Sequence, residues 1–351
     1  NLQPAGAAGS GGQSGRLAAH SQITHPVTGN LRKTQVEETC WKVNSLSYAL
    51  SPIRSLALLS ASVFLSACVS YTANDQAEAK LTRTPYQVIE NQLYTPPDWP
   101  QALHADIYKP EGEQLRPAVL LVHGGAWTRR HRDDMRGTAK QLAARGFVAV
   151  NISYRFAPEY QFPAQLHDMQ QAMRWIHDNA GTYNIDTSRI AAMGYSSGAH
   201  LVSLLALVAG TGDELDSPYG GAITRPAAVV AGGTPSDLRK FEGGTLVPQF
   251  LGGTIKEVPE LYAQASPVVH IHDKAPPFFI YHGTGDMLVS ADHATDFYQA
   301  LQNADIPSEL YLMRLQGHVA AFLTSGFAVK ESMRFLQTVM PERPQANALA
   351  H

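Results

Sequence analysis

Short apolar runs that alternate with amphipathic segments are the feature of this chain that most constrains its fold. The run 116–127 (RPAVLLVHGGAW) is apolar almost throughout and carries glycines near its end, which is typical of a strand buried on both faces of a parallel sheet. Residues 162–181 instead carry apolar side chains at helical spacing, and 133–146 end in a glycine that can cap a helix. The alternation predicts βαβ units, and therefore an α/β fold in which helices cover both faces of a mostly parallel central sheet.

The same reading extends along the chain from about residue 85. The predicted strands, with the loops that follow them, are 102–110, 116–127, 147–155, 188–198, 227–233, 277–286 and 308–318, and the predicted helices are 133–146, 162–181, 199–210 and 327–340. Residues 234–265 interrupt this rhythm with Gly and Pro. We expect them to form a small cap over the ligand-binding edge of the sheet, because the loops at that edge usually determine specificity. The alternative is a surface loop that connects a strand to the next helix.

The N-terminal region has a different composition. Residues 1–50 begin with a stretch rich in Gly, Ala, Ser and Gln, and we expect them to be disordered or absent from the native product. Arg54 then precedes an apolar run, 56–65, and small residues lead to Cys68. This is the pattern of a secretory signal, and the run is shorter than the roughly 20 residues that span a bilayer.

The stretch LSAC, which ends at Cys68, resembles the lipobox of bacterial lipoprotein signal peptides. The resemblance implies lipidation of Cys68 and a lipid-anchored place in the bacterial cell envelope, facing the periplasm. The alternative is a buried N-terminal helix in a cytoplasmic protein. The resulting segments are a signal peptide at 51–68, a tether at 69–84, a folded α/β domain at 85–340 and a C-terminal tail at 341–351.

Charge and cysteine usage exclude several classes of function. The net charge of -3 provides no broad basic surface, so we expect no nucleic-acid partner. The two cysteines, Cys40 and Cys68, both lie before the regular region, which therefore has neither a disulfide framework nor a cysteine-based metal site. The 14 histidines are scattered. We predict no metal and no cofactor.

Residues 194–198 read GYSSG, which has the form G-x-S-x-G. The bare pattern is weak, and Ser196 could be an ordinary turn serine. A predicted strand precedes it and a predicted helix follows it, which is the context of a nucleophile elbow. The glycines leave room for a sharp turn, and the helix directs N–H groups toward the site. We therefore interpret Ser196 as a nucleophile.

Polar residues follow several of the predicted strands directly. They are the segment 123–125, Ser196, Asp286 and His318. The carboxyl ends of parallel strands lie at one edge of a sheet, and ligands bind there. The sequence therefore predicts that these residues gather at a single site.

Several motifs together resemble the α/β-hydrolase family over about residues 100–340. They are HGGAW (123–127), YRFAPEYQFPAQLHD (154–168), GYSSGAHL (194–201), HGTGDMLV (282–289) and QGH (316–318). Within the family, the chain looks closest to the HGG-type esterases, which include hormone-sensitive-lipase-like, feruloyl/acetylxylan-esterase-like and kynurenine-formamidase-like groups.

The resemblance implies a catalytic triad in the chain order Ser196, Asp286, His318. Ser196 would attack an acyl carbonyl, His318 would act as its base, and Asp286 would orient the imidazole. Asp292 and Asp296 are weaker candidates for the acid. The histidines that fit the base less well are His123, His200, His282 and His293.

The HGGAW segment would supply part of the oxyanion hole. The donors are the N–H groups of Gly125, Ala126 and Ser197, with Gly124 making the turn; lipase-type relatives often have Gly in place of Ala126. Trp127 either lines the pocket or packs its loop. The expected cap residues that face substrate are Phe241, Leu246 and Phe250. For Asp168 and the YRFAPE segment we expect a structural role.

These features together predict a serine carboxylesterase that acts on small-molecule esters through an acyl-enzyme on Ser196. One alternative keeps the same machinery but cleaves a small amide, as in arylformamidase-like relatives. Another is a non-catalytic envelope binding protein that retains the hydrolase fold.

Overall fold

The computed structural model describes residues 69–72 and 83–342. The expectations for residues 1–50, for the signal peptide at 51–68 with Cys68, and for most of the C-terminal tail lie outside these residues. In the described ranges, no helix is both long and apolar enough to cross a membrane.

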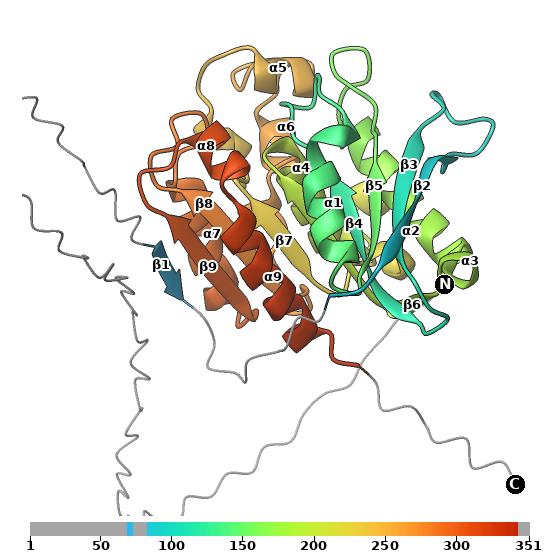
Figure 1. Ribbon diagram of the computed structural model, residues 1–351. Coiled ribbons are helices and arrows are strands. Elements are labelled where there is room, and N and C mark those ends of the chain that lie inside the picture. The colour runs from blue at the N-terminus through green and yellow to red at the C-terminus, as the bar shows by residue number, and fades with distance from the viewer. Residues whose placement is uncertain (1–68, 73–82, 343–351) are drawn as a thin grey trace, which may run out of the picture. The chain divides into compact units, whose positions relative to one another are not determined.

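The strands of the described residues form one sheet in the order β1-β9-β8-β7-β6-β4-β5-β3-β2 (Figure 1). Strands β4 to β9 run parallel to one another. At one edge β1 pairs antiparallel with β9, and at the other β3 pairs antiparallel with β5 and β2 with β3. The bounds are β1 (Val69–Thr72), β2 (Tyr86–Leu93), β3 (His104–Pro110), β4 (Arg116–Val122), β5 (Val148–Ile152), β6 (Ile185–Tyr195), β7 (Val229–Gly232), β8 (Phe278–Gly283) and β9 (Ser308–Met313).

Helices cover both faces of this sheet, as the alternation predicts. The α-helices are α1 (Arg136–Ala143), α2 (Ala164–Asp178), α3 (Ala180–Tyr183), α4 (Ser197–Val208), α5 (Leu246–Leu251), α6 (Pro259–Gln264), α7 (Asp292–Asn303), α8 (His318–Leu323) and α9 (Gly326–Val339). Short 3₁₀ turns lie at η1 (Arg132–Met135), η2 (Glu214–Asp216), η3 (Ala222–Thr224), η4 (Leu238–Lys240) and η5 (Pro267–His270).

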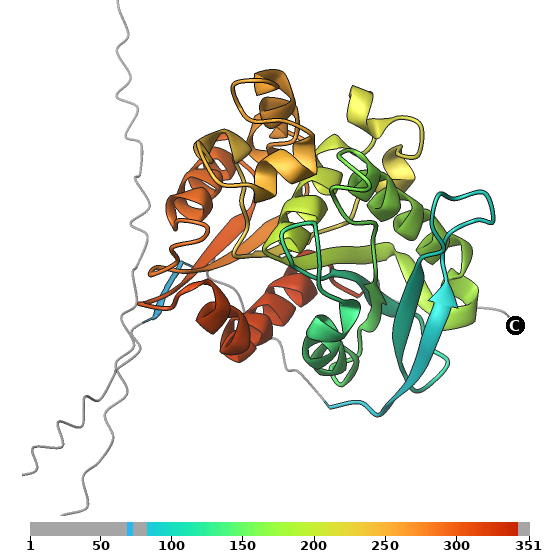
Figure 2. The same ribbon diagram turned by 90° about the horizontal axis from the view of Figure 1, so that it is seen from above.

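Two hydrophobic cores lie on opposite faces of the sheet. One is formed with α2, α4 and α7, and the other with α1 and α9 (Figure 2). Successive strand residues alternate between them: Leu120 packs in the first core, and its neighbours Val119 and Leu121 pack in the second. Because both faces are covered, the central strands must be apolar on both sides, which explains their continuous apolar runs.

Two strands differ from the sequence prediction. β2 is an edge strand with mostly exposed side chains, so its sequence YQVIENQL carries no buried-strand pattern. β1 falls inside the expected tether at 69–84 and pairs antiparallel with β9. The chain therefore joins the sheet directly after residue 68.

The loops after β4, β6, β8 and β9 all leave the carboxyl edge of the sheet. The segment expected to form a cap, 234–265, connects β7 to the η5 turn and contains η4, α5 and α6. Figure 1 shows α5 above this edge, near the loop end of the sheet. The fold thus brings the predicted polar residues and the cap to one side.

Candidate active site

Ser196 lies on the tight turn between β6 and α4. Its backbone has φ 54° and ψ −124°, a conformation that is rarely populated by a residue with a side chain. The turn is held in part by the Ser196 N–H, which donates to the carbonyl of Gly232 on β7 at 2.7 Å. The sharp reversal carries the hydroxyl off the end of the sheet, as a nucleophile elbow requires.

Two glycines make this turn possible by allowing close backbone contact. A Cβ atom on Gly198 would lie 2.2 Å from the carbonyl oxygen of Val122, and one on Gly194 would lie 2.3 Å from the carbonyl carbon of Gly198. No side chain fits at either position. The two glycines of the GYSSG motif therefore let the start of α4 pack directly against β4 and β6.

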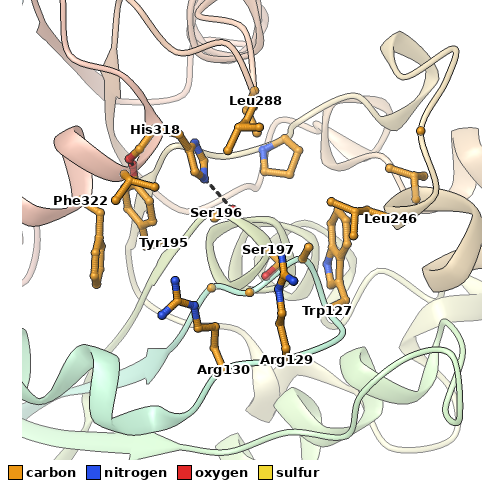
Figure 3. A pocket seen from close by; sticks show the side chains of 18 of the residues that line it. Trp127, Arg129, Arg130, Tyr195, Ser196, Ser197, Leu246, Leu288, His318 and Phe322 are labelled. Carbon is orange, nitrogen blue, oxygen red and sulfur yellow. Dashed lines mark hydrogen bonds between the residues drawn. The ribbon is translucent and has the colours of Figure 1, made fainter.

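The structure brings the three predicted triad residues together. The Nε2 atom of His318 lies 2.9 Å from Oγ of Ser196 (Figure 3). Its Nδ1 atom lies 2.5 Å from Oδ2 of Asp286. A serine, an imidazole and a carboxylate in this chain of contacts can transfer the hydroxyl proton to the ring. His318 is the first residue of α8, whereas the sequence predicts a loop at this position.

Asp286 is fixed by more partners than the sequence indicated. The N–H groups of Leu288 and Val289 each donate to its Oδ1 atom at 2.9 Å. Its other oxygen, Oδ2, lies 3.3 Å from Nε2 of His282. Burial by itself would raise the pKa of Asp286, but hydrogen bonds with His282, His318 and Val289 outweigh it and hold the pKa well below its usual range. The carboxylate is therefore ionised throughout the neutral range.

Tyr195, the residue before the nucleophile, was not among the predicted site residues. Its hydroxyl donates to the carbonyl of His318 at 2.5 Å, and its ring centroid lies 5.2 Å from that of the imidazole. The contact depends on β6 and α8 meeting in space, so no local pattern around Tyr195 indicates it.

The predicted oxyanion residues surround Ser196. The loop after β4 has positive φ at Gly125, Ala126 and Trp127. Gly124, Gly125, Ala126 and Ser197 all line the same cavity as Ser196. Ser197 is the first residue of α4, so its N–H has no acceptor within the helix and is free to bind an oxyanion. Ala126 takes φ 54°, a left-handed conformation, at the position where lipase-type relatives often have Gly.

The cavity has a volume of about 550 Å³, and Trp127, Phe241 and Leu246 are among the residues that line it. Phe250 does not: it is fully buried and stacks on Trp127 with ring centroids 4.5 Å apart. Leu246 begins α5 and is 40% exposed at the cavity, whereas Phe250, one turn further along, is covered by the rings of Trp127 and Phe162. The expectation that Phe250 contacts substrate is therefore wrong, and Phe250 supports the pocket wall from behind.

Trp127 both lines the pocket and anchors its loop. Its indole Nε1 donates to Nδ1 of His200 at 3.2 Å, while Nε2 of His200 lies 2.7 Å from the carbonyl of Ala265. These partners place the ring proton on Nε2. Burial lowers the pKa of His200 to about 4, so the neutral ring links α4 to the segment after α6.

Several further residues line the cavity that the sequence reading did not select. The apolar ones come from the loop after β8 and from α8, and two arginines come from the loop after β4. They include Arg129, Arg130, Leu288, Val319, Phe322 and Leu323. Each of them lies within a few positions of Gly125, Asp286 or His318, and this closeness in sequence could have indicated that they lie near the site.

The remaining predicted residues lie away from the triad. Asp168 is buried and bound to Arg155 at 2.8 Å, and it also accepts from Trp99 Nε1 at 2.8 Å, which agrees with a structural role. Asp292 and Asp296 lie on α7, where both bind the Lys240 ammonium at 2.7 Å. Neither is placed to orient His318.

The sheet order, the helices on both faces and the strand–Ser196–helix turn define an α/β-hydrolase fold. A sequence model of the BD-FAE family matches residues 105–301, and the chain belongs to that family.

Curated relatives of the chain include named esterases. Esterase LipC of Mycobacterium tuberculosis is 30% identical over 56% of this chain and 51% of its own length. Isoprenylcysteine alpha-carbonyl methylesterase ICME of Arabidopsis thaliana is 26% identical over 62% of this chain and 54% of its own. The chain thus spans about half the length of the curated relatives it matches.

Solved structures show the same fold. A truncated carbohydrate esterase from gut microbiota aligns with a TM-score of 0.65 and 24% identity, covering 75% of this chain and 99% of that one. The apo form of Thermogutta terrifontis esterase 2 aligns with a TM-score of 0.62 and 23% identity, covering 76% and 98%. The latter enzyme has also been solved with propionate or butyrate bound.

Proposed function

We propose that this protein is a serine carboxylesterase that cleaves small carboxylic esters. The observation that carries the proposal is the continuous contact from Ser196 Oγ through His318 to Asp286, at 2.9 and 2.5 Å, beside a cavity of about 550 Å³. Membership in the BD-FAE family and the names of the esterase relatives support it.

The reaction begins when Ser196 Oγ attacks the ester carbonyl and its proton passes to Nε2 of His318. The negative charge that develops on the carbonyl oxygen is bound by backbone N–H groups of Ala126 and Ser197, with Gly125 as the other donor. Asp286 keeps the Nδ1 proton in place and stabilises the imidazolium.

The tetrahedral intermediate then collapses. The C–O bond to the leaving alcohol breaks, and the alcohol takes the proton from Nε2 of His318, which leaves an acyl-enzyme on Ser196. Water enters, gives a proton to His318 and attacks the acyl carbon. Release of the carboxylic acid returns the proton to Ser196, and the cycle consumes one water.

The walls of the cavity favour an apolar acyl or alcohol group of modest size. Trp127, Leu246, Leu288 and Phe322 face it, and the small carboxylates bound to the Thermogutta enzyme support short acyl chains as first substrates.

The test is hydrolysis of p-nitrophenyl acetate and p-nitrophenyl butyrate by the full chain beside its Ser196→Ala variant. We expect the rate to fall on the order of a thousandfold or more in the variant, because the proposed acyl-enzyme forms on the Ser196 hydroxyl. The ratio of the two rates measures the acyl pocket. Equal rates in a folded protein would reject acyl transfer at Ser196; activity on N-formylkynurenine alone would indicate the amidase, and activity on neither would indicate a binding protein.

We further propose that the chain is held in the bacterial cell envelope by a lipid on Cys68. The LSAC stretch and the apolar run before it support this location. Mass spectrometry of the membrane-bound protein should find a diacylglyceryl group on the Cys68 peptide, and a Cys68→Ser variant should lose it. A native protein with an unmodified Cys68 would contradict the anchor.

A further inference from the structure

A group of exposed, large apolar side chains lies along one side of the mouth of the cavity. They come from the loops after β8 and β9, from α8 and from the start of α9, and they are between 57% and 96% exposed. We call this group the apolar rim; it consists of Met287, Leu288, Leu315, Val319, Leu323 and Phe327. The five most exposed large apolar residues in the described part of the chain all belong to it.

The apolar rim is continuous with the wall of the cavity. The loops after β8 and β9 are joined by hydrogen bonds, from the Leu315 N–H to Thr284 Oγ1 at 2.8 Å and from the Gly285 N–H to the carbonyl of Gln316 at 3.0 Å. Leu288, Val319 and Leu323 also line the cavity itself. The rim therefore borders the cavity that contains Ser196.

Such a surface is costly in water. Burying large apolar side chains lowers the free energy, and contiguous exposed apolar patches mark sites of interaction. The other exposed large apolar residues include Leu115 before β4 and Ile223 in η3, which lie near the amino ends of strands. The residues of the apolar rim, by contrast, all lie at the carboxyl edge of the sheet.

Strand β1 brings the start of the described chain to this same edge. Val69 lies opposite Met313, the last residue of β9, and the two strands run antiparallel (Figure 1). The rim residue Leu315 follows Met313 by two positions. In the sequence, Cys68 is bonded directly to Val69, so the proposed acyl chain would be attached next to the residue that lies at this edge.

Positive charge lies on the other side of the cavity mouth. Arg129 and Arg130 are exposed and line the cavity, on the side away from His318 and Leu288 in Figure 3. Within the described residues Arg129 has no acidic partner, and Arg130 lies 4.0 Å from Asp134. Cations beside a protruding apolar surface suit the headgroups and acyl region of an anionic bilayer.

We propose that the apolar rim docks on the surface of an anionic lipid bilayer, so that the cavity opens toward the membrane and receives esters from the lipid phase. The rim inserts among the acyl chains, and Arg129 and Arg130 contact the headgroups. The inference rests on the proposed envelope location and adds an orientation to it; it does not depend on acyl transfer.

The test places an environment-sensitive NBD fluorophore at single positions of the full chain. Cys40 and Cys68 are replaced by Ser, so that the introduced thiol is unique and no acyl anchor is present. The labelled variants are Met287→Cys and Phe327→Cys in the rim, with Leu115→Cys as the control. Each is mixed with vesicles of equimolar phosphatidylcholine and phosphatidylglycerol, with and without a spin label on the lipid acyl chains.

We expect the labels at 287 and 327 to shift to the blue and to be quenched by the spin label, while the label at 115 keeps its emission in water. Labels at all three positions that stay in water, or a label at 115 that enters as deeply, would overturn the proposal. The Ser196→Ala variant should give the same fluorescence, so a failure of the esterase assignment is distinguished from a failure of docking.

A kinetic comparison uses residues outside the cavity lining. The variant Met287→Gln/Phe327→Gln should hydrolyse a long-chain ester embedded in the vesicles about tenfold more slowly, because less apolar surface enters the bilayer. Its rate on soluble p-nitrophenyl acetate should equal that of the wild type. The matched control is Leu115→Gln/Ile223→Gln, and an equal loss in both double variants would contradict a role for the rim.

Discussion

The phenolic hydroxyl of Tyr195 donates to the carbonyl oxygen of His318 at 2.5 Å. Tyr195 directly precedes the nucleophile Ser196, and this hydrogen bond fixes the backbone of His318. The same imidazole contacts Ser196 through Nε2. The turn at the end of β6 therefore positions Ser196 directly and positions His318 through Tyr195. This coupling explains how the turn and the short helix α8 keep the hydroxyl and the imidazole within hydrogen-bonding distance.

Removal of this hydroxyl tests the coupling. In Tyr195→Phe, we expect kcat for p-nitrophenyl butyrate to fall about tenfold with little change in KM, because the imidazole loses its positioning contact but the cavity keeps its shape. The melting temperature should fall only slightly, since one hydrogen bond contributes about 1 kcal/mol. A wild-type kcat in the variant would mean that α8 holds His318 without help.

His282 is expected to position Asp286. Its Nε2 lies 3.3 Å from Asp286 Oδ2 and 2.8 Å from the carbonyl of Val289. In His282→Leu the carboxylate loses this donor, and we expect kcat to fall by about tenfold or more. His282→Gln keeps an N–H donor and should recover part of the rate. Equal kcat values for the two variants, after correction for folded fraction, would limit His282 to packing.

Replacing Gly198 by Ala should destabilise the fold by a steric clash, and Gly137→Ala is the matched control. In Gly198→Ala the new Cβ would lie 2.2 Å from the carbonyl oxygen of Val122, so α4 must move away from β4. We expect a loss of about 3 kcal/mol or more in the free energy of unfolding. Gly137→Ala, on α1, meets nothing within 4 Å and should gain about 0.5–1 kcal/mol. Urea unfolding of both variants measures the difference, and comparable stabilities would show that the elbow relaxes.

The buried histidine His200 predicts a pH dependence of stability. Burial lowers its pKa from 6.5 to about 4 in the folded chain. Between these values the unfolded chain binds more protons than the folded chain, so acidification favours unfolding. One such group contributes a slope of about 1.4 kcal/mol per pH unit. His200→Gln should therefore show a shallower decline than wild type over this range in urea titrations at fixed pH. An unchanged slope would mean that His200 is protonated in the folded protein.

Much of the fold could be predicted because the central strands and helices carry their own periodic signals. The run at 116–127 is apolar because both faces of β4 are covered, and this is visible without knowing what covers them. β2 was missed for the converse reason: an edge strand exposed to solvent needs no apolar pattern. β1 was missed because its pairing depends on β9, which is distant in the chain.

Some residues of the candidate site could likewise be predicted from the sequence, and others could not. Ser196, Asp286 and His318 each follow a strand, so the sequence could assign them to one edge of the sheet. The sequence reading placed Phe250 in the pocket because an aromatic residue in a cap is as consistent with substrate contact as with packing. Its stack on Trp127 exists only once α5 lies against the loop after β4.

By itself, the sequence determined the alternation of strands and helices, the glycines that permit a sharp turn at Ser196, and the order of the three site residues. These are properties of short segments and follow from local sterics and hydrophobic period. The tertiary structure decided the distances between Ser196, Asp286 and His318, the contacts of Tyr195 and His282, and the position of the apolar rim beside the cavity. Ser196 and His318 are 122 residues apart, and only the order of strands in the sheet brings such residues within hydrogen-bonding distance.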